Sequence, residues 1–351
     1  MTSGAQDWGL DGLALGVAIA GPIHATEWAR GLEWVDRAEA LGLHSVWVPE
    51  MHFTPTGNAA PLLSLAAVAA RTKRLRVATT SVLLPIHHPV RLAAEAIAVD
   101  QLSGGRLILG LGRGFSPPLF AAFGIDPAEK RDLFDESLDA ILRVFRGQRA
   151  ELSEGPFDAG PLAPDRSDAS ARQRPHPPLG VAAFGKKGLT QAARRGLPYL
   201  ASPMEPFDLI AENHAHHRSE LPGDVDADEL PVPVMRTVFV AESQTEADAA
   251  LAAHARESRM PSGRKLPPAL ARAAAAPPED RVVIGCLDDV TRRLARYREA
   301  IGLDLLIVRP QVAGVDEHAR RRSFERLVDD VLPALRGTSA PASRVGSQSG
   351  V

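Results

Sequence analysis

Short apolar runs alternate along this chain with longer segments whose apolar residues recur every three or four positions. The short runs have the length of strands, and the longer segments have the period of amphipathic helices. Most runs precede a helical segment, so the chain consists largely of repeated strand-helix units. The eight runs that we predict to be strands are residues 13–20, 44–50, 76–85, 106–112, 178–184, 198–202, 232–241 and 304–310.

The composition of these runs narrows the fold class. They are apolar at nearly every position, which is typical of parallel strands that are covered on both faces. Regular alternation of strand and helix leaves either a doubly wound open sheet or a closed barrel. Eight units without an obvious linker favour the barrel, so we expect an α/β fold, a single-domain (β/α)8 TIM barrel over residues 1–337.

Two stretches interrupt the alternation, and the end of the chain lacks it. Residues 148–177 are rich in Pro, Gly, Ser, Asp and Arg, and residues 254–280 are rich in Ala and Pro. We expect both to be irregular insertions in the barrel, since loops of this length in a compact fold are commonly lids or mobile excursions. The tail over residues 338–351 has the composition of a disordered segment.

The charge balance excludes several kinds of partner. The chain has 40 basic and 43 acidic side chains, a net charge of −3, and no stripe of Lys or Arg, so we expect no nucleic-acid partner. Cys286 is the only cysteine, which fits a reducing compartment. The first residues lack the pattern of a secretory signal, and no apolar run reaches the roughly 18 residues that span a bilayer. We expect a cytoplasmic protein without a membrane partner.

The candidate site follows from the barrel itself. In such barrels the catalytic groups lie at the carboxyl ends of the strands and in the loops that follow. The second predicted strand ends in Glu50-Met51-His52-Phe53, and we expect the active site to be centred there. The other strand ends place further candidates on the same rim: Thr80, Ser81, His87, His88, Gly112, Arg113, Gly114, Phe115 and Arg309.

The fifth predicted strand leads into a glycine-containing turn ahead of a predicted helix. Such a turn presents backbone N–H groups to an anion, and the positive end of the helix dipole adds to the attraction. Arg113 can add a bidentate contact to a phosphate. We predict that Arg113 and this turn hold a phosphorylated ligand, although the two lysines are also explained as solvated surface charge. The turn consists of Phe184, Gly185, Lys186, Lys187 and Gly188.

The remaining histidines have ordinary structural interpretations. His87 and His88 lie in the turn PIHHP, where a structural role explains them better than metal binding. His214, His216 and His217 share a predicted exposed helix, where a solvated face explains them. We therefore predict no metal site.

Three motifs follow one another between residues 88 and 114, namely HPVRLAAE, DQLSGGR and LGLGRG. Together with WVPEMHFTPTG before them and FGIDP after them, they make the chain similar to the bacterial luciferase-like monooxygenases. Weaker similarity covers residues 178–202, 283–294 and 331–336, so it spans most of the chain from Leu13 to Arg336. The resemblance implies a barrel that binds reduced flavin mononucleotide (FMN) or the deazaflavin coenzyme.

The resemblance also implies roles for individual residues. It implies a cis peptide bond between Thr80 and Ser81, in a bulge behind the flavin ring, and it places Arg113 near the flavin phosphate. The turn over residues 184–188 corresponds to the phosphate-binding loop. The cofactor contacts that we expect are Thr80, Ser81, Gly112, Arg113, Phe184, Gly185, Lys186 and Gly188.

One position departs from the family pattern. Glu50, His52 and Phe53 match the Glu-His-His-Phe signature of the bacterial luciferases, but Met51 occupies the place of the first histidine, which is implicated there in acid-base chemistry. A thioether cannot transfer protons. We therefore expect His52 and Glu50 to be the catalytic residues. Gly112 similarly takes the place of a reactive but non-essential cysteine.

The activity that the resemblance implies is a two-component monooxygenase. A separate flavin reductase would supply reduced FMN, and the enzyme would use dioxygen to oxidise a small apolar organic substrate, with Phe53, Phe115 and Phe184 as candidate pocket walls. Two alternatives remain open. One is a deazaflavin-dependent oxidoreductase on the same barrel, and the other is a non-catalytic flavin-binding partner subunit, which Met51 permits. We expect a homodimer.

Overall fold

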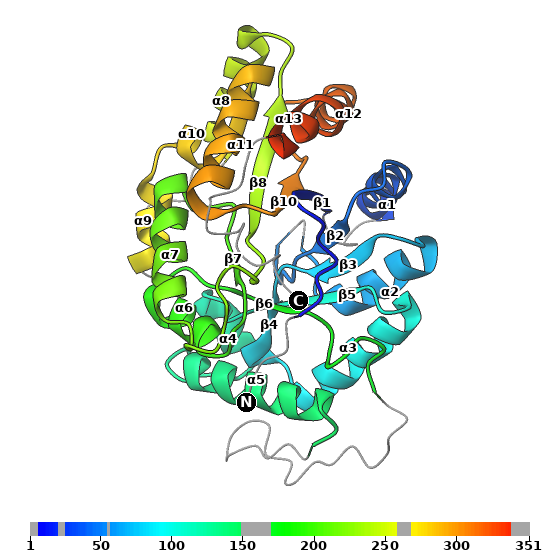
Figure 1. The fold of residues 1–351 in the computed structure, drawn as a ribbon, viewed down its shortest axis with the longest axis vertical. Helices are drawn as coiled ribbons and strands as arrows, with labels where there is room; N and C mark the ends of the chain where they lie inside the picture. Colours follow the sequence, from blue (N-terminus) through cyan, green and yellow to red (C-terminus); the bar gives the residue numbers. More distant parts are fainter. Residues whose placement is uncertain (1–5, 20–24, 55–56, 149–169, 258–267, 338–351) are drawn as a thin grey trace, which may run out of the picture. The chain divides into compact units, whose positions relative to one another are not determined.

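The computed structural model describes residues 6–19, 25–54, 57–148, 170–257 and 268–337. The chain divides into two compact units. The first unit lies within residues 3–8 and 19–182, and the second within residues 9–18 and 183–351. In both units parallel strands alternate with helices along the chain (Figure 1).

The first unit contains a parallel sheet of short, buried strands. The strands pair in the order β6-β5-β3-β2, and β4 lies beside β5. Val77 lies opposite Leu107, and Leu109 lies opposite Leu179, which fixes the register of the three central strands. The strands are β2 (Ser45–Val48), β3 (Arg76–Thr79), β4 (Val82–Leu83), β5 (Leu107–Gly112) and β6 (Leu179–Ala182).

The helices of the first unit begin and end at recognisable residues. α2 and α3 begin at Pro61 and Pro89, and proline suits a first helical turn because the N–H that it lacks has no partner there. α3 ends before Gly104, whose φ of 74° is a left-handed cap. α2 packs on α3, and α3 on α5 (Figure 1). The helices are α1 (Ala25–Ala40), α2 (Pro61–Arg71), α3 (Pro89–Ser103), α4 (Pro117–Ala122), α5 (Lys130–Phe145) and the 3-10 turn η1 (Leu84–Ile86).

The second unit has its own parallel sheet. β1 pairs with β10, β10 with β8, and β8 with β9, while Ala201 forms a parallel bridge with Val234. The strands are β1 (Ala14–Ala18), β7 (Tyr199–Leu200), β8 (Pro233–Val240), β9 (Val283–Gly285) and β10 (Leu305–Arg309). The helices are α6 (Lys186–Ala193), α7 (Phe207–Ser219), α8 (Gln244–Glu257), α9 (Pro268–Ala275), α10 (Pro278–Arg281), α11 (Leu287–Ile301), α12 (Glu317–Arg326), the π-helical turn η2 (Leu327–Val331) and α13 (Leu332–Arg336).

A buried polar network joins β8 to the β7–α7 segment in the second unit. The Glu205 carboxylate accepts hydrogen bonds from the Tyr199 hydroxyl at 2.8 Å and from Asn213 Nδ2 at 2.6 Å. The fully buried Arg236, on β8, donates to the backbone carbonyls of Ser202 and Glu205 at 2.8 and 2.7 Å. These bonds give partners to polar groups that burial would otherwise penalise.

The structure confirms the parallel α/β fold and has a strand in each of the eight predicted runs, but the predicted strand over residues 76–85 is divided into β3 and β4 and ends in η1. β9 was not predicted, because three residues are too few to show a periodicity. The closure of the strands into one barrel and the single domain remain predictions.

The predicted irregular insertion over residues 254–280 is wrong where the structure describes it. α8 continues to Glu257, and α9 and α10 occupy most of residues 268–281. Alanine has the highest helix propensity, and a proline at the first helical position does not oppose it. The middle of the other predicted insertion, residues 149–169, and the predicted tail, residues 338–351, lie outside the described residues, as do residues 258–267.

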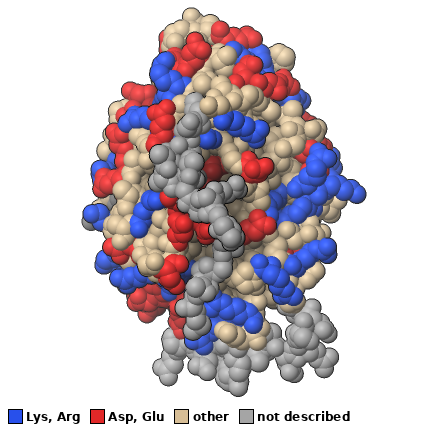
Figure 2. Space-filling model, in the orientation of Figure 1, with Lys and Arg blue, Asp and Glu red and all other residues tan. Residues whose placement is uncertain are grey.

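The surface agrees with the low net charge. Basic and acidic side chains are interspersed over the face shown in Figure 2. Within the described ranges, none of the helices combines the length and the apolar character needed to cross a membrane.

Candidate active site

The centre of the candidate site is the Glu50 side chain, which follows β2 in the first unit and is fully buried. Its Oε2 accepts the backbone N–H of Leu83 at 2.7 Å. Its Oε1 accepts His52 Nε2 at 2.7 Å, and His87 Nε2 lies 2.9 and 3.0 Å from the two carboxylate oxygens. One buried carboxylate therefore holds two imidazoles and a loop amide.

These contacts determine the charge of Glu50. Burial alone raises the pKa of this carboxyl, but the hydrogen bond and charge of His87, with the bonds from His52 and the Leu83 N–H, outweigh it and lower the pKa below its usual value. The carboxylate is therefore ionised at neutral pH and can only accept. Each histidine must then donate its Nε2–H, which leaves Nδ1 as the nitrogen that can take up a proton.

Two histidines and a carboxylate are also the ligand set of some iron enzymes. Here both Nε2 atoms are hydrogen-bonded directly to the carboxylate, so the three side chains do not point at a common vacant centre. Within the described part of the chain, no group of three or more His, Cys, Asp or Glu is arranged to hold a metal ion.

The segment after β3 lies against Glu50. The Thr80–Ser81 peptide bond is cis, as the family resemblance implied. The Thr80 N–H donates to the Val48 carbonyl at 2.9 Å, and the Glu50 N–H donates to the Ser81 carbonyl at 3.4 Å. Together with the bond from Leu83 to the carboxylate, these contacts attach residues 80–83 to the end of β2.

Gly112, at the end of β5, lies against the same segment. A Cβ atom at this position would lie 2.2 Å from Ser81 Oγ and 3.1 Å from Ser81 Cβ. The glycine therefore permits the close approach of β5 to the cis bond. Five of the predicted site residues, Glu50, His52, Thr80, Ser81 and Gly112, are thus brought together in the first unit.

Aromatic rings surround His52. Its ring centre lies 5.1 Å from that of Phe123, in an edge-on arrangement, and 5.9 Å from that of Phe53. Phe53 has a φ of 56° and is 74% exposed, and Phe115 is also exposed. Phe123 was not predicted as a site residue, because it lies in sequence far from any strand end.

Arg113 is one of three cations near the end of β5. Burial lowers the pKa of Arg113, and the charge of Arg131 lowers it further, while Asp135 opposes the shift. Burial lowers the pKa of Lys130 as well, and the charges of Arg113 and Arg131 add to the effect. Lys130 Nζ lies 5.4 Å from the centre of the Phe120 ring. Cations gathered in this way create a positive potential that attracts an anion.

The predicted phosphate-binding turn lies in the second unit, at the start of α6. Gly185 is the extended residue before the helix, and its carbonyl accepts the Gly188 N–H at 2.9 Å. The N–H groups at the first two helical positions, Lys186 and Lys187, have no acceptor within the helix. The donors suited to an anion are therefore those of the two lysines rather than that of Gly188. Phe184, the first residue of the turn, is half-buried.

The interpretation of His214, His216 and His217 as one solvated face is wrong for His217. This residue is buried on α7, and its Nε2 donates to the Leu197 carbonyl at 2.8 Å. Burial lowers the pKa of His217, so the ring is neutral and acts as a structural donor. His216 lies 3.2 Å from the Thr190 hydroxyl.

His87 is a strand-end candidate for which the sequence favours a structural role in the turn PIHHP over metal binding. The structure places its Nε2 against both oxygens of Glu50, a contact that was not predicted. The only signal available was its position shortly after the third strand.

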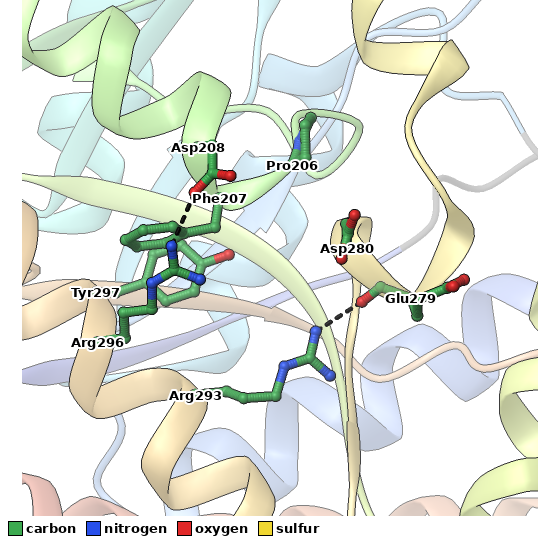
Figure 3. Close-up of a pocket in the computed structure, with 8 residues that line it drawn as sticks. All are labelled: Pro206, Phe207, Asp208, Glu279, Asp280, Arg293, Arg296 and Tyr297. Carbon is green, nitrogen blue, oxygen red and sulfur yellow. Dashed lines mark hydrogen bonds and ion pairs between the residues drawn. The ribbon is translucent and has the colours of Figure 1, made fainter.

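A pocket of about 400 Å³ opens in the second unit and contains no predicted site residue. Arg296 pairs with Asp208 at 2.8 Å and lies over the Phe207 ring, while Arg293 donates to the Glu279 carbonyl at 2.6 Å (Figure 3). Its two arginines thus have partners within the wall. The pocket is lined by Pro206, Phe207, Asp208, Glu279, Asp280, Arg293, Arg296 and Tyr297.

Comparison with known proteins gives one matching family and several relatives. The family model described as luciferase-like monooxygenase matches residues 12–304. The chain is 31% identical over 323 residues to 4-hydroxyprotoasukamycin monooxygenase of Streptomyces nodosus subsp. asukaensis, covering 87% of this chain and 85% of that protein. It is 28% identical over 327 residues to the oxygenase component of flavin-dependent trigonelline monooxygenase of Acinetobacter baylyi, covering 87% and 89%.

Solved structures share the fold. The oxygenating constituent of 3,6-diketocamphane monooxygenase from Pseudomonas putida, in complex with FMN, matches with a TM-score of 0.70 and 20% identity, over 92% of this chain and 98% of that chain. The coenzyme F420 dependent tetrahydromethanopterin reductase from Methanopyrus kandleri matches with a TM-score of 0.68 and 16% identity, over 93% and 100%.

Proposed function

The chain belongs to the luciferase-like monooxygenase family and is an oxidoreductase of the monooxygenase type, and on this basis we propose that it is the oxygenase component of a two-component flavin system. In this proposal a separate reductase supplies reduced FMN, and a small apolar organic molecule is oxidised with dioxygen. The observation that carries the proposal is the buried, ionised Glu50, which holds His52 and is hydrogen-bonded to the segment after β3. We further propose a cytoplasmic homodimer.

Reduced FMN fits the residues present in the first unit. Gly112 lets the Ser81 side chain lie directly against the end of β5, and we propose that the flavin ring binds beside this segment. Arg113, with Lys130 and Arg131, would hold the phosphate by charge. The turn at residues 184–188, in the second unit, is proposed separately as a phosphate-binding turn. When bound, the flavin would supply the electrons that activate dioxygen.

In this proposal, side chains of the protein itself transfer the protons of the reaction and orient the group that does so. Glu50 fixes the His52 ring by accepting its Nε2–H, so His52 Nδ1 is the atom that exchanges a proton with the reacting group. The rings of Phe53 and Phe123 beside His52 would limit the access of water. Met51 takes no part in proton transfer, since a thioether has no exchangeable proton.

The proposal is tested with His52→Ala and Arg113→Ala, using Arg91→Ala on the exposed face of α3 as the control. We expect Arg113→Ala to weaken anaerobic binding of reduced FMN by about 10- to 100-fold, the value of a charge-assisted contact. His52→Ala should keep this binding and lower flavin-dependent oxygen consumption by about 100-fold. The proposal is wrong if both variants consume oxygen at the rate of the unmodified protein.

The same titration separates the alternatives. The fold shared with a coenzyme F420 dependent reductase favours a deazaflavin-dependent oxidoreductase as the second candidate. Binding of coenzyme F420 in preference to FMN, with hydride transfer and no oxygen consumption, would support it. Binding of FMN with neither reactivity would support a non-catalytic partner subunit.

A further inference from the structure

His87 contacts the same buried Glu50 carboxylate as His52, but it comes from the turn after β4, whereas His52 follows β2. The 3-10 turn η1 ends at His87, whose N–H donates to the Leu84 carbonyl at 3.1 Å. This turn directs the ring toward Glu50, where Nε2 contacts both oxygens. The His87 side chain is 27% exposed and that of His52 is 10% exposed, so His87 has the better access to water.

Both imidazole rings contact the Glu50 carboxylate, and among the described residues no Lys or Arg side chain is hydrogen-bonded to it. Its hydrogen bonds with described residues come from His52, His87 and the Leu83 N–H, and none of these donors is a Lys or Arg. A buried carboxylate without a counter-charge is costly. An imidazolium on either ring supplies the counter-charge, whereas two imidazoliums on one carboxylate repel each other.

We infer that His87 is a second proton-carrying residue of the site, and that His52 and His87 share one proton beyond their two Nε2–H groups. The inference rests on the proposed function. Before the reaction the extra proton is on His87 Nδ1. When His52 Nδ1 takes a proton from the reacting group, His87 Nδ1 releases its proton to water.

This exchange balances in atoms and charge. One bond from the reacting group to hydrogen breaks and one N–H bond forms at His52, while one N–H bond breaks at His87 and one O–H bond forms in water. The Glu50 cluster keeps the same net charge throughout, so the buried carboxylate is never left without its counter-charge. The reverse sequence applies when His52 donates a proton.

Two substitutions at His87 separate proton transfer from support of the turn. His87→Gln keeps an N–H donor for Glu50 but cannot exchange a proton, and His87→Ala removes both. The control is His216→Gln, on α7 in the second unit. Circular dichroism and thermal melting establish that each variant is folded, and anaerobic titration measures its affinity for reduced FMN.

The rate of flavin-dependent oxygen consumption then decides the role. We expect His87→Gln to bind reduced FMN within about threefold of the unmodified protein but to react about 100-fold more slowly. Added imidazole should restore part of the rate in His87→Ala. An unchanged rate in His87→Gln, or a slow His87→Ala that imidazole does not rescue, would overturn the inference and leave His87 as a support for the turn.

Nitrogen-15 NMR of the histidine rings gives a readout that does not depend on flavin. At neutral pH we expect the rings of His52 and His87 together to carry three protons, and His87→Gln to leave the extra proton on His52. Two neutral rings, each protonated only at Nε2, would contradict the shared proton even if the flavin chemistry is correct. If the proton count is three but the protein neither binds nor oxidises reduced FMN, the proposed function fails and the shared proton stands.

Discussion

Gly112 is packed so closely against Ser81 that a larger residue at its position requires the Ser81 side chain to move. The hydroxyl of Ser81 lies 2.2 Å from the place of an added Cβ, well inside any normal contact distance, and Ser81 Cβ lies 3.1 Å from it. The identity of residue 112 is coupled to the shape of the proposed flavin site.

We expect Gly112→Ala to lower the free energy of unfolding by about 1–3 kcal/mol, the usual cost of overpacking a close contact. Affinity for reduced FMN should fall with it, because the displaced Ser81 side chain belongs to the proposed flavin site. Urea denaturation and anaerobic titration measure the two effects. Gly223→Ala is the control, since a Cβ there meets nothing within 4 Å. Adding Ser81→Gly should recover part of the loss, and no recovery would show that the contact is not the cause.

His44 predicts how the stability of the first unit depends on pH. Its Nε2 donates to the Trp8 carbonyl at 2.8 Å, and burial lowers the pKa of the ring from 6.5 to about 4. As the pH falls below 6.5, the His44 ring becomes protonated in the unfolded chain but stays neutral in the folded chain until the pH approaches 4. The contribution of His44 to stability is therefore complete above pH 6.5 and falls as the pH drops toward 4, by about 3 kcal/mol.

The measurement is urea denaturation at a series of pH values between 4 and 8. His44→Gln keeps a hydrogen-bond donor but does not titrate, so its stability should decrease less steeply over this range. The interpretation fails if the two proteins lose stability in parallel.

At the scale of an element, the turn between α3 and β5 is held by the side chain of Arg106. Its guanidinium donates to the backbone carbonyls of Ala69, Thr72 and Leu75, at the end of α2 and in the segment before β3. It also donates to the Ser103 carbonyl, at the end of α3. Arg106, the last residue of the DQLSGGR motif, thus has a structural role.

We expect Arg106→Lys to lower the free energy of unfolding by about 2–4 kcal/mol, because an ammonium cannot reach several carbonyls in the planar geometry of a guanidinium. Arg91→Lys, in an exposed ion pair with Glu95 on α3, should change it by less than about 0.5 kcal/mol. Chemical denaturation of both variants compares them directly. Equal losses would mean that the Arg106 contacts do not stabilise the turn.

The elements themselves were largely predictable, because period and caps are local properties. Pro61 and Pro89 marked helix starts correctly, and each predicted run contains a strand. The predictions were wrong or incomplete where a residue's environment depends on contacts distant in sequence, or where the element is short. His217 is buried, and it contacts Leu197, outside its own helix. β9 is only three residues long. The helices within residues 268–281 were not predicted, because their prolines were interpreted as signs of irregular structure.

The candidate site divides in the same way. Glu50, His52 and Ser81 followed from the rule that strand ends carry the chemistry, and the cis bond followed from the resemblance. The rule also named His87 as a candidate, but did not predict its contact with Glu50, which depends on a 3-10 turn and joins residues 37 positions apart. Hydrophobic periodicity in the sequence does not predict this contact between His87 and Glu50.

At the scale of the whole molecule, the predicted closed barrel implies that the protein unfolds cooperatively. One continuous core should unfold in a single transition, in which the calorimetric and van 't Hoff enthalpies agree. Arg106→Lys in the first unit and Glu205→Gln in the second should then lower the same melting temperature. Two separable transitions, each sensitive to only one of these variants, would show that the units unfold independently and that the single-domain prediction is wrong.

The bond between the Leu83 amide and Glu50 links residues 33 positions apart in the sequence. This amide hydrogen can exchange for deuterium only when that bond opens, so its rate of isotope uptake follows the contact directly. A compound that binds in the site and either competes for the Glu50 carboxylate or covers it would change the deuterium uptake of the peptide that contains Leu83. Mass spectrometry of one peptide can therefore screen candidate substrates before any product is known, including compounds that give no optical signal.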